Sequence, residues 1–372
     1  MIHKGFLGRG SVLKIAVISD LHFNMWRKNN TFFKHLMEFF DFFIEEVNRQ
    51  EVEYIVIAGD LFHTKSIISA EMLLKTTGVF KLLNKNCPNV KAIYIIPGNH
   101  DIYLRKDSEW NILHIYQEFQ KIQVFHSPGH VDLGNHRLWF LPYYRSAKEY
   151  RRHLNMIDIS QAKTNILFSH IGVDDFKMLE TEDIAIVERS EFIKKDKFKK
   201  FDQVFLGHFH GYQSQDNITY VSSPIQSKHG DEFGEHGFII YDTKSKSYEF
   251  IPNHTSPQFL TKKLNMKNLK ELLAQDGEGK FIRIVLTEHI PSNKLSIIID
   301  KLKKKNYNVE IKFSINNSMF YDESIASIQN WDELVFNSTE ELFQKFLNFV
   351  ETDLDKDRLY KFITSLRINN NV

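Results

Sequence analysis

Short runs rich in β-branched residues alternate with stretches of helical periodicity over the first two thirds of the chain. Such runs, bounded by polar or turn residues, are typical of buried strands. Residues 31–50 place Phe, Leu, Met and Ile at intervals of three and four, which predicts a helix with an apolar face in the core. The alternation favours an α/β fold. The predicted strands are residues 14–19, 54–58, 92–96, 165–169, 203–206, 218–221 and 238–241.

The pattern changes after residue 252. Residues 281–290 and 308–315 predict strands, and residues 291–307 predict the helix between them, so that the three form a compact βαβ unit. Farther on, a Ser-x-x-Glu capping box precedes two apolar stripes at helical spacing. Those stripes either pack on the chain's own core or dock a partner. We expect a main domain over residues 1–252, a small α+β domain over 253–320 and a helical segment over 321–372.

Composition limits the class of protein. The 372 residues are 42% hydrophobic and 26% charged, which suits a globular chain with a large buried core. No stretch approaches the roughly 20 apolar residues that span a bilayer, and the N-terminus lacks the apolar centre of a secretory signal, so we expect no membrane association. The single cysteine, Cys87, cannot form an internal disulfide and favours a reducing, cytoplasmic location.

The formal charge of +1 conceals an uneven distribution along the chain. Residues 261–313 carry 12 Lys or Arg and 6 Asp or Glu, whereas residues 319–358 carry 3 and 10. The basic stretch could face phosphates and the acidic stretch should not. Either stretch could also be ordinary solvated surface.

Residue types that bind metals follow five of the predicted strands. Because sites form at the carboxyl edge of an α/β sheet, we expect these side chains to converge there. The Asp-x-His and His-x-His motifs each place two donors two residues apart, and in an extended segment both would point to one side. Carboxylate, amide oxygen and imidazole favour Mn²⁺ or Fe²⁺, with Zn²⁺ also compatible, over Mg²⁺. The residues are Asp20, His22, Asp60, His63, Asn99, His100, Asp101, His170, His208 and His210.

The loop Pro97-Gly98-Asn99-His100-Asp101 has a simpler explanation as well. Pro, Gly, Asn and Asp are preferred in turns for conformational reasons alone. The four companion motifs shift the interpretation towards the corner of an active site.

The order of these motifs resembles the calcineurin-like metallophosphoesterases, whose pattern is D-x-H, G-D, G-N-H-D, H and G-H-x-H. The resemblance covers roughly residues 13–252 and implies two sheets packed face to face with helices outside. It also implies two divalent metal ions, with Mn²⁺ as the expected metal. Asp60 would bridge them. One ion would be held by Asp20, His22, Asp60 and His210, and the other by Asp60, Asn99, His170 and His208.

Two such ions can polarise a phosphoryl group and activate water for in-line attack on phosphorus. His100 is the candidate that protonates or stabilises the departing alkoxide, and Asp101 is its candidate orienting partner. The motif Gly59-Asp60-Leu61-Phe62-His63 resembles SbcD-type nucleases of DNA-break repair, and it lacks the arginine of the protein-phosphatase motif G-D-x-V-D-R-G. In that branch, His63 would assist catalysis or position DNA.

The resemblance to this nuclease branch also implies a substrate, DNA, and a protein partner. Residues 253–320 would cap DNA, and residues 321–372 would bind an SbcC-like ATPase of the SMC family. Lysines can hold a phosphodiester backbone without reading sequence. The DNA-contact candidates are Lys301, Lys303, Lys304 and Lys305, with His229 and His236 within reach of a substrate groove in principle.

We therefore predict a two-metal DNA nuclease that is the catalytic subunit of an SbcCD-like repair or recombination complex. Exonuclease action on duplex ends, with some endonuclease action on single strands, follows from the resemblance alone. Two alternatives stay open, a small-substrate phosphodiesterase or nucleotidase and a scaffold that binds DNA or an ATPase without cutting. Whether the chain forms a homodimer also stays open.

Overall fold

Two six-stranded sheets form the main body of the protein. A computed structural model describes residues 13–23, 30–63, 68–103, 110–159, 163–176, 192–287 and 290–313. The first sheet has the order β12-β11-β1-β2-β3-β4 and the second β5-β6-β7-β8-β10-β9. The strands of the first sheet are β1 (Lys14–Ile18), β2 (Tyr54–Ala58), β3 (Ala92–Ile96), β4 (Ile122–Val124), β11 (Gly237–Asp242) and β12 (Ser247–Pro252). Those of the second are β5 (Gly129–Leu133), β6 (His136–Leu141), β7 (Thr164–His170), β8 (Gln203–Gly207), β9 (Gln213–Gln215) and β10 (Ile218–Tyr220).

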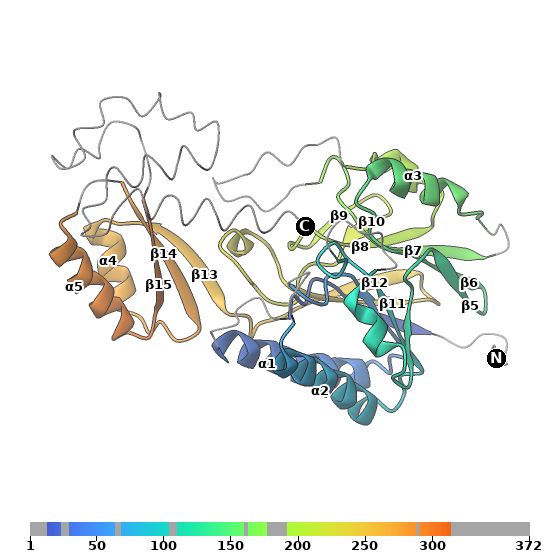
Figure 1. The fold of residues 1–372 in the computed structure, drawn as a ribbon, viewed down its shortest axis with the longest axis horizontal. Coiled ribbons are helices and arrows are strands. Elements are labelled where there is room, and N and C mark those ends of the chain that lie inside the picture. The colour runs from blue at the N-terminus through green and yellow to red at the C-terminus, as the bar shows by residue number, and fades with distance from the viewer. Residues whose placement is uncertain are drawn as a thin grey trace, which may run out of the picture. The chain divides into compact units, whose positions relative to one another are not determined.

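The two sheets pack face to face, and helices cover their outer faces (Figure 1). Strand β1 shows the arrangement, because Ile15 and Val17 enter the core between the sheets while Ala16 and Ile18 pack under helices. A strand buried on both faces reads as a continuous hydrophobic run. The predicted sandwich is therefore confirmed. The helices are α1 (Asn30–Arg49) and α2 (Ala70–Asn86) on the first sheet and α3 (Ala147–Met156) on the second, with short 3₁₀ turns at Ile112–Tyr116, Lys195–Phe198 and Asp231–Phe233.

The aromatic stripe of α1 lies in the core, as its spacing predicts. Phe39, Phe40 and Phe43 are all at most 1% exposed. The ring of Phe43 meets that of Phe238 on β11 edge-on, with centroids 4.9 Å apart. These contacts anchor the helix to the sheet and leave no role for the stripe in ligand binding.

The direction of the strands sets the position of the site. Strands β1, β2 and β3 pair in parallel, and so do β6, β7 and β8. Their carboxyl ends consequently meet along one edge of each sheet, where all five motif loops begin. The predicted strands do not include the edge strands β4, β5, β9 and β12, because short half-buried strands lack a continuous apolar run, and they also omit the interior strand β6.

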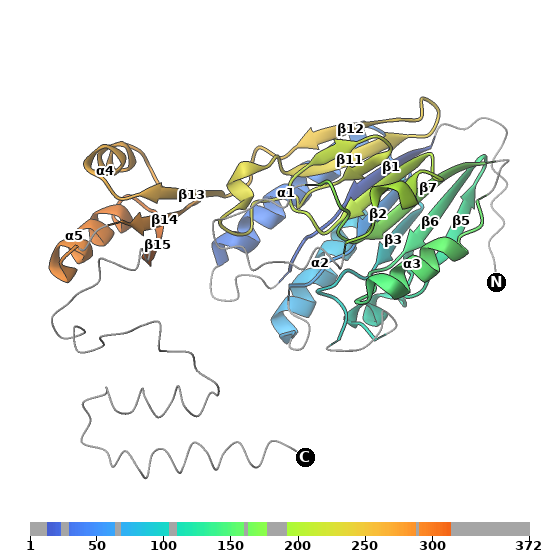
Figure 2. The same cartoon turned by 90° about the horizontal axis from the view of Figure 1, so that it is seen from above.

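A smaller three-stranded parallel sheet follows, with the order β13-β14-β15 (Figure 2). The predicted βαβ unit is confirmed, and it supplies the second and third strands of this sheet. The first strand of the sheet and the helix that follows it are not among the predicted elements. The predicted segment 321–372 lies outside the described residues. None of the described helices is long and apolar enough to cross a bilayer. The elements are β13 (Gln258–Lys263), α4 (Met266–Leu273), β14 (Lys280–Leu286), α5 (Ser292–Lys303) and β15 (Asn308–Phe313).

Candidate metal centre

The loops after β1 and β2 are held side by side by backbone hydrogen bonds. The amide of Asp20 donates to the carbonyl of Gly59 at 3.1 Å, and the amide of His22 donates to the carbonyl of Asp60 at 3.0 Å. The expected extended geometry of the Asp-x-His and His-x-His motifs is wrong, since Asp20, His22 and His208 have φ angles of +53°, +45° and +101°. In the loop after β1, this left-handed turn leaves the Asp20 carboxylate 3.0 Å from the amide of His208 and Nε2 of His22 3.7 Å from a carboxylate oxygen of Asp60.

Four candidate ligands converge on one side of the site. The Nε2 atom of His22 lies 3.1 Å from Nε2 of His210 and 3.7 Å from a carboxylate oxygen of Asp60. An oxygen of Asp20 lies 3.8 Å from the same His22 nitrogen and 4.0 Å from Nε2 of His210. The structure thus brings together the first predicted ligand set.

The second predicted set converges beside the first. Nε2 of His170 lies 3.1 Å from the amide oxygen of Asn99 and 3.4 Å from a carboxylate oxygen of Asp60. The same Asn99 oxygen lies 3.0 Å from Nδ1 of His208. Asp60 therefore contacts members of both sets, which is the position that a bridging ligand needs.

The protonation of these groups suits a cation site. Burial lowers the pKa of His208 to about 3, and burial also holds the pKa of His22 well below its ordinary value. His170 differs, since the nearby Asp60 carboxylate outweighs the effect of burial and raises the His170 pKa to about 9. Neutral imidazoles are metal ligands, and binding at His170 must displace its proton. Imidazole and carboxylate donors that converge in this way fit divalent cations.

Two glycines of the motifs are required by close packing. A Cβ on Gly207 would lie 2.0 Å from Oγ of Ser19, and a Cβ on Gly98 would lie 2.2 Å from a carboxylate oxygen of Asp60. Any larger residue at either position would push candidate ligands or their supports apart.

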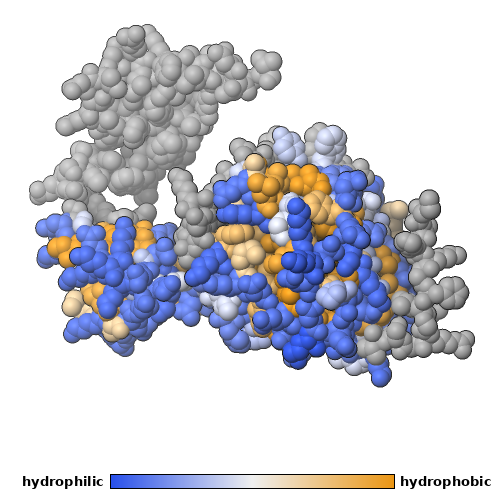
Figure 3. Space-filling view, turned by 90° about the horizontal axis from the view of Figure 1, so that it is seen from below, coloured by the Kyte–Doolittle hydropathy of each residue, from blue (hydrophilic) through white to orange (hydrophobic). Residues whose placement is uncertain are grey.

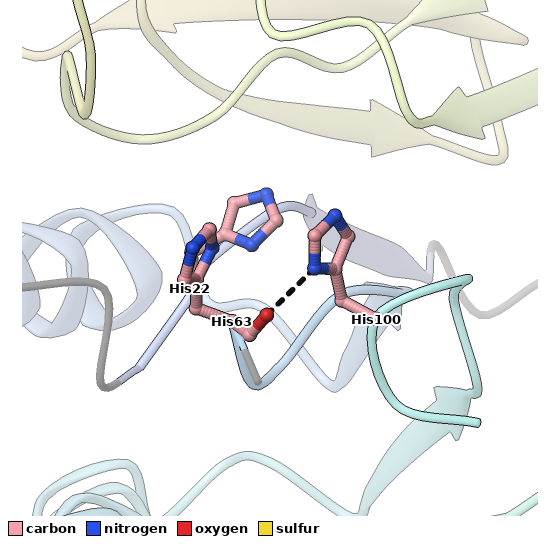
Figure 4. Close-up of side chains that lie close together, drawn as sticks. All are labelled: His22, His63 and His100. Atoms are coloured by element: carbon pink, nitrogen blue, oxygen red, sulfur yellow. Dashed lines mark hydrogen bonds between the residues drawn. The ribbon is translucent and has the colours of Figure 1, made fainter. Parts of the chain in front are cut away.

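His63 and His100 lie beside His22, a member of the first ligand set (Figure 4). Their rings stack with centroids 5.2 Å apart, and the ring of His100 meets that of His22 edge-on at 4.9 Å. Nδ1 of His100 lies 2.6 Å from the carbonyl oxygen of His63. Because a carbonyl only accepts, Nδ1 is the donor, and Nε2 of His100 takes no part in this hydrogen bond. Burial, followed by the nearby His100, lowers the pKa of His63 to about 4.

Asp101 does not orient His100 in the structure. Its buried carboxylate accepts hydrogen bonds from the amides of Gly98, Leu61 and Phe62 at 2.9, 3.2 and 2.9 Å. Burial and the Asp60 carboxylate raise the Asp101 pKa to about 7. The His100 ring is oriented by its hydrogen bond to the carbonyl of His63, and not by Asp101 as the sequence suggested. Asp101 instead ties the loop after β3 to the loop after β2.

Asp101→Asn is expected to lower the free energy of unfolding by about 1–3 kcal/mol, because an amide has one acceptor oxygen for three buried N–H donors. Urea unfolding in EDTA measures this change without a contribution from metal binding. The control is Asp41→Asn, a matched substitution on the exposed surface of α1. Equal stability of the two variants would contradict the structural role.

The predicted DNA contacts lie in different environments. The four lysines of α5 and its C-terminal turn are exposed, in a region whose hydrophilic residues dominate the face shown in Figure 3. His236 is buried, and its ring nitrogens lie 2.7 Å from the carbonyl of Asp231 and 3.2 Å from that of Ser223, so the DNA contact predicted for it is wrong. The His229 side chain is only 5% exposed and lies 3.4 Å from Glu310, which also leaves little of it for DNA. The four lysines in question are Lys301, Lys303, Lys304 and Lys305.

Sequence comparison identifies the class of protein. The chain belongs to the calcineurin-like phosphoesterase family, whose model matches residues 13–212. It is therefore a metal-dependent phosphoester hydrolase, and the family's divalent metal ions fit the grouped candidate ligands.

Sequence similarity to individual relatives extends beyond residues 13–212. Exonuclease subunit 1 of Enterobacteria phage T4 is 22% identical over 320 residues, which are 83% of this chain and 85% of the phage protein. The uncharacterised protein R555 of Acanthamoeba polyphaga mimivirus is 24% identical over 322 residues, and the match spans 83% of this chain but only 23% of that protein. A solved dimetal phosphatase from Danio rerio aligns with 61% of this chain and 91% of its own, with 9% identity and a TM-score of 0.38.

Proposed function

We propose that the protein is a DNA nuclease of the SbcD type that hydrolyses phosphodiester bonds with two metal ions. The observation that carries the proposal is the likeness to the phage T4 exonuclease subunit along 83% of this chain, well past the phosphoesterase match. Action on duplex ends and on single strands, within a repair or recombination complex, forms part of the proposal.

In the proposed centre, Asp60 lies between two ligand sets and would contribute to both. Two divalent cations bound there, with Mn²⁺ as the proposed metal, would polarise the phosphoryl group and activate the attacking water. His100 presents Nε2, because its Nδ1 is bonded to the carbonyl of His63. A protonated Nε2 can neutralise the alkoxide that leaves the phosphorus. His63 packs against the His100 ring and is proposed to position it or the DNA.

A basic cleft supports a polymeric substrate. The cleft has a volume of about 990 Å³, and among the described residues it is lined by four basic and two acidic side chains. The amide of Lys228 donates to the Asp231 carboxylate at 3.2 Å, and that carboxylate lies 3.2 Å from His210, so this end of the cleft lies near the candidate metal centre. A phosphodiester backbone extending from the centre would meet positive charge. The charged lining residues are Lys34, Lys228, Arg283, Lys303, Glu278 and Glu310.

The domain roles and partners are also proposals. Residues 253–320 are proposed to cap DNA through the exposed lysines of α5 and its C-terminal turn. Residues 321–372 are proposed to bind an SbcC-like ATPase of the SMC family. The phage relative is named as a subunit, which supports membership of a complex.

The test uses the double variant Lys228→Glu, Lys303→Glu with an end-labelled duplex and Mn²⁺. We expect the wild type to cut the duplex and the variant to cut it poorly, with hydrolysis of bis-p-nitrophenyl phosphate unchanged. The slope of log affinity against log salt should fall by about 0.9 for each lost phosphate contact, hence by up to about 2. Lys270→Glu on α4, outside the cleft lining, is the control.

Two other outcomes would indicate a different function. Hydrolysis of the small diester by the wild type without salt-sensitive DNA binding would indicate a small-substrate phosphodiesterase or nucleotidase. DNA binding without hydrolysis of either substrate would indicate a scaffold.

A further inference from the structure

His210 has different surroundings at its two ring nitrogens. Nε2 faces the candidate ligands, 3.1 Å from Nε2 of His22 and 4.0 Å from an oxygen of Asp20. Nδ1 faces away from them and lies 3.2 and 3.3 Å from the two carboxylate oxygens of Asp231. The sequence motif gave no indication of Asp231, which lies 21 residues downstream and beyond the family match that ends at residue 212.

Asp231 is held in place from several directions. Its side chain is fully buried, and one carboxylate oxygen accepts hydrogen bonds from the amide and hydroxyl of Ser227 at 2.8 and 2.9 Å. The amide of Lys228 donates to the same oxygen at 3.2 Å. The backbone carbonyl of Asp231 is fixed by the ring of the buried His236 at 2.7 Å. A buried carboxylate with this many donors has a single well-defined position.

We propose that Asp231 is a positioning residue of the metal centre: its carboxylate accepts the Nδ1–H of His210 and leaves the Nε2 lone pair for the metal. The inference rests on the proposed role of His210 as a ligand. A carboxylate behind a metal-binding imidazole selects the tautomer, fixes the ring and increases its basicity. Loss of such a partner typically costs 10–100-fold in metal affinity.

A purely structural role for Asp231 would have a different consequence. Ser227 and Lys228 are donors within the same turn, so Asp231 could simply close the segment that precedes β11. In that case its replacement would destabilise the fold and leave the metal affinity of the folded protein unchanged. Metal affinity, measured on folded protein, therefore separates the two roles.

The experiment compares Asp231→Ala and Asp231→Asn with the wild type in the full chain. Proteins stripped of metal are titrated with Mn²⁺ in a calorimeter, after circular dichroism has established that they are folded. We expect Asp231→Ala to weaken one Mn²⁺ site by about 10–100-fold and to leave the second site unchanged. Asp231→Asn keeps an acceptor oxygen and the side-chain shape, so it should fold even if the alanine variant does not, and should weaken the same site less.

Glu232→Gln is the matched control, because it removes one charge in the same turn while Glu232 bonds the amide of Gly230 and not His210. Wild-type affinity at both sites in the folded asparagine and alanine variants would overturn the proposal, and so would equal weakening of both sites. A wild type that binds Mn²⁺ but cuts no DNA would refute the proposed nuclease and leave the Asp231 inference standing.

A spectroscopic measurement tests the tautomer directly. In metal-free protein with ¹⁵N-labelled histidine above neutral pH, we expect the His210 ring to carry its proton on Nδ1, with the signal assigned by its loss in His210→Asn. Asp231→Ala should shift this tautomer population, whereas Glu232→Gln should not. Protonation of Nε2 in the wild type would contradict the proposal even if the alanine variant failed to fold.

Discussion

Replacement of Asp60 by alanine is expected to reduce phosphodiester hydrolysis by about 10³-fold or more. Asp60 contacts both candidate ligand sets, lying 3.7 Å from His22 and 3.4 Å from His170. Stabilisation of transition-state charge by bound metal is worth several kcal/mol, and about 4 kcal/mol corresponds to a thousandfold change in rate. Both metal sites should weaken, in contrast to the single site expected for Asp231 variants.

Initial rates on bis-p-nitrophenyl phosphate with Mn²⁺, together with the metal content after dialysis, measure the effect of Asp60→Ala. The substitution also removes the acceptor of the His100 amide at 2.8 Å, so circular dichroism should accompany the rates. The control is Asp41→Ala, on the exposed face of α1. A rate within about threefold of the wild type would rule out a bridging role for Asp60, since the loss of transition-state stabilisation would then be under 1 kcal/mol.

The positions of the candidate ligands could be predicted because they depend on a simple rule. Parallel strands buried on both faces have long hydrophobic runs, and the polar residues that follow them must gather at the carboxyl edge. The run before Asp60 and the run before Asn99 are adjacent strands of one sheet, and the run before His208 belongs to the facing sheet. The sequence therefore indicated the convergence without showing any distance.

The residues that support the ligands could not be found in the same way. Asp231 reaches His210 only because the chain returns to the site after β10, and no spacing rule predicts such a return. Asp101 adjoins His100 in sequence, yet its carboxylate accepts hydrogen bonds from three backbone amides, one in its own loop and two in the loop after β2. Adjacency in a turn does not fix side-chain direction, which depends on where unpaired donors lie.

His100→Ala is expected to separate proton transfer from metal binding. Its side chain is oriented through Nδ1 by the carbonyl of His63, which points to Nε2 as the atom that meets the leaving oxygen. Loss of a general acid typically costs 10²–10⁴-fold, and we expect a decrease of that size for DNA. Mn²⁺ stoichiometry should stay at the wild-type value, because the contact between this residue and Asp60 is made by its backbone amide.

The leaving group provides the discriminating comparison for His100→Ala. A deoxyribose alkoxide is strongly basic and needs a proton, whereas p-nitrophenolate leaves readily without one, so hydrolysis of bis-p-nitrophenyl phosphate should fall by less than about tenfold. The exposed His254→Ala is the control for both substrates. An equal decrease on DNA and on the small diester would assign His100 to phosphate stabilisation rather than to protonation of the leaving group. That pattern arises because a group that stabilises the phosphoryl charge acts on both substrates alike, whatever group departs.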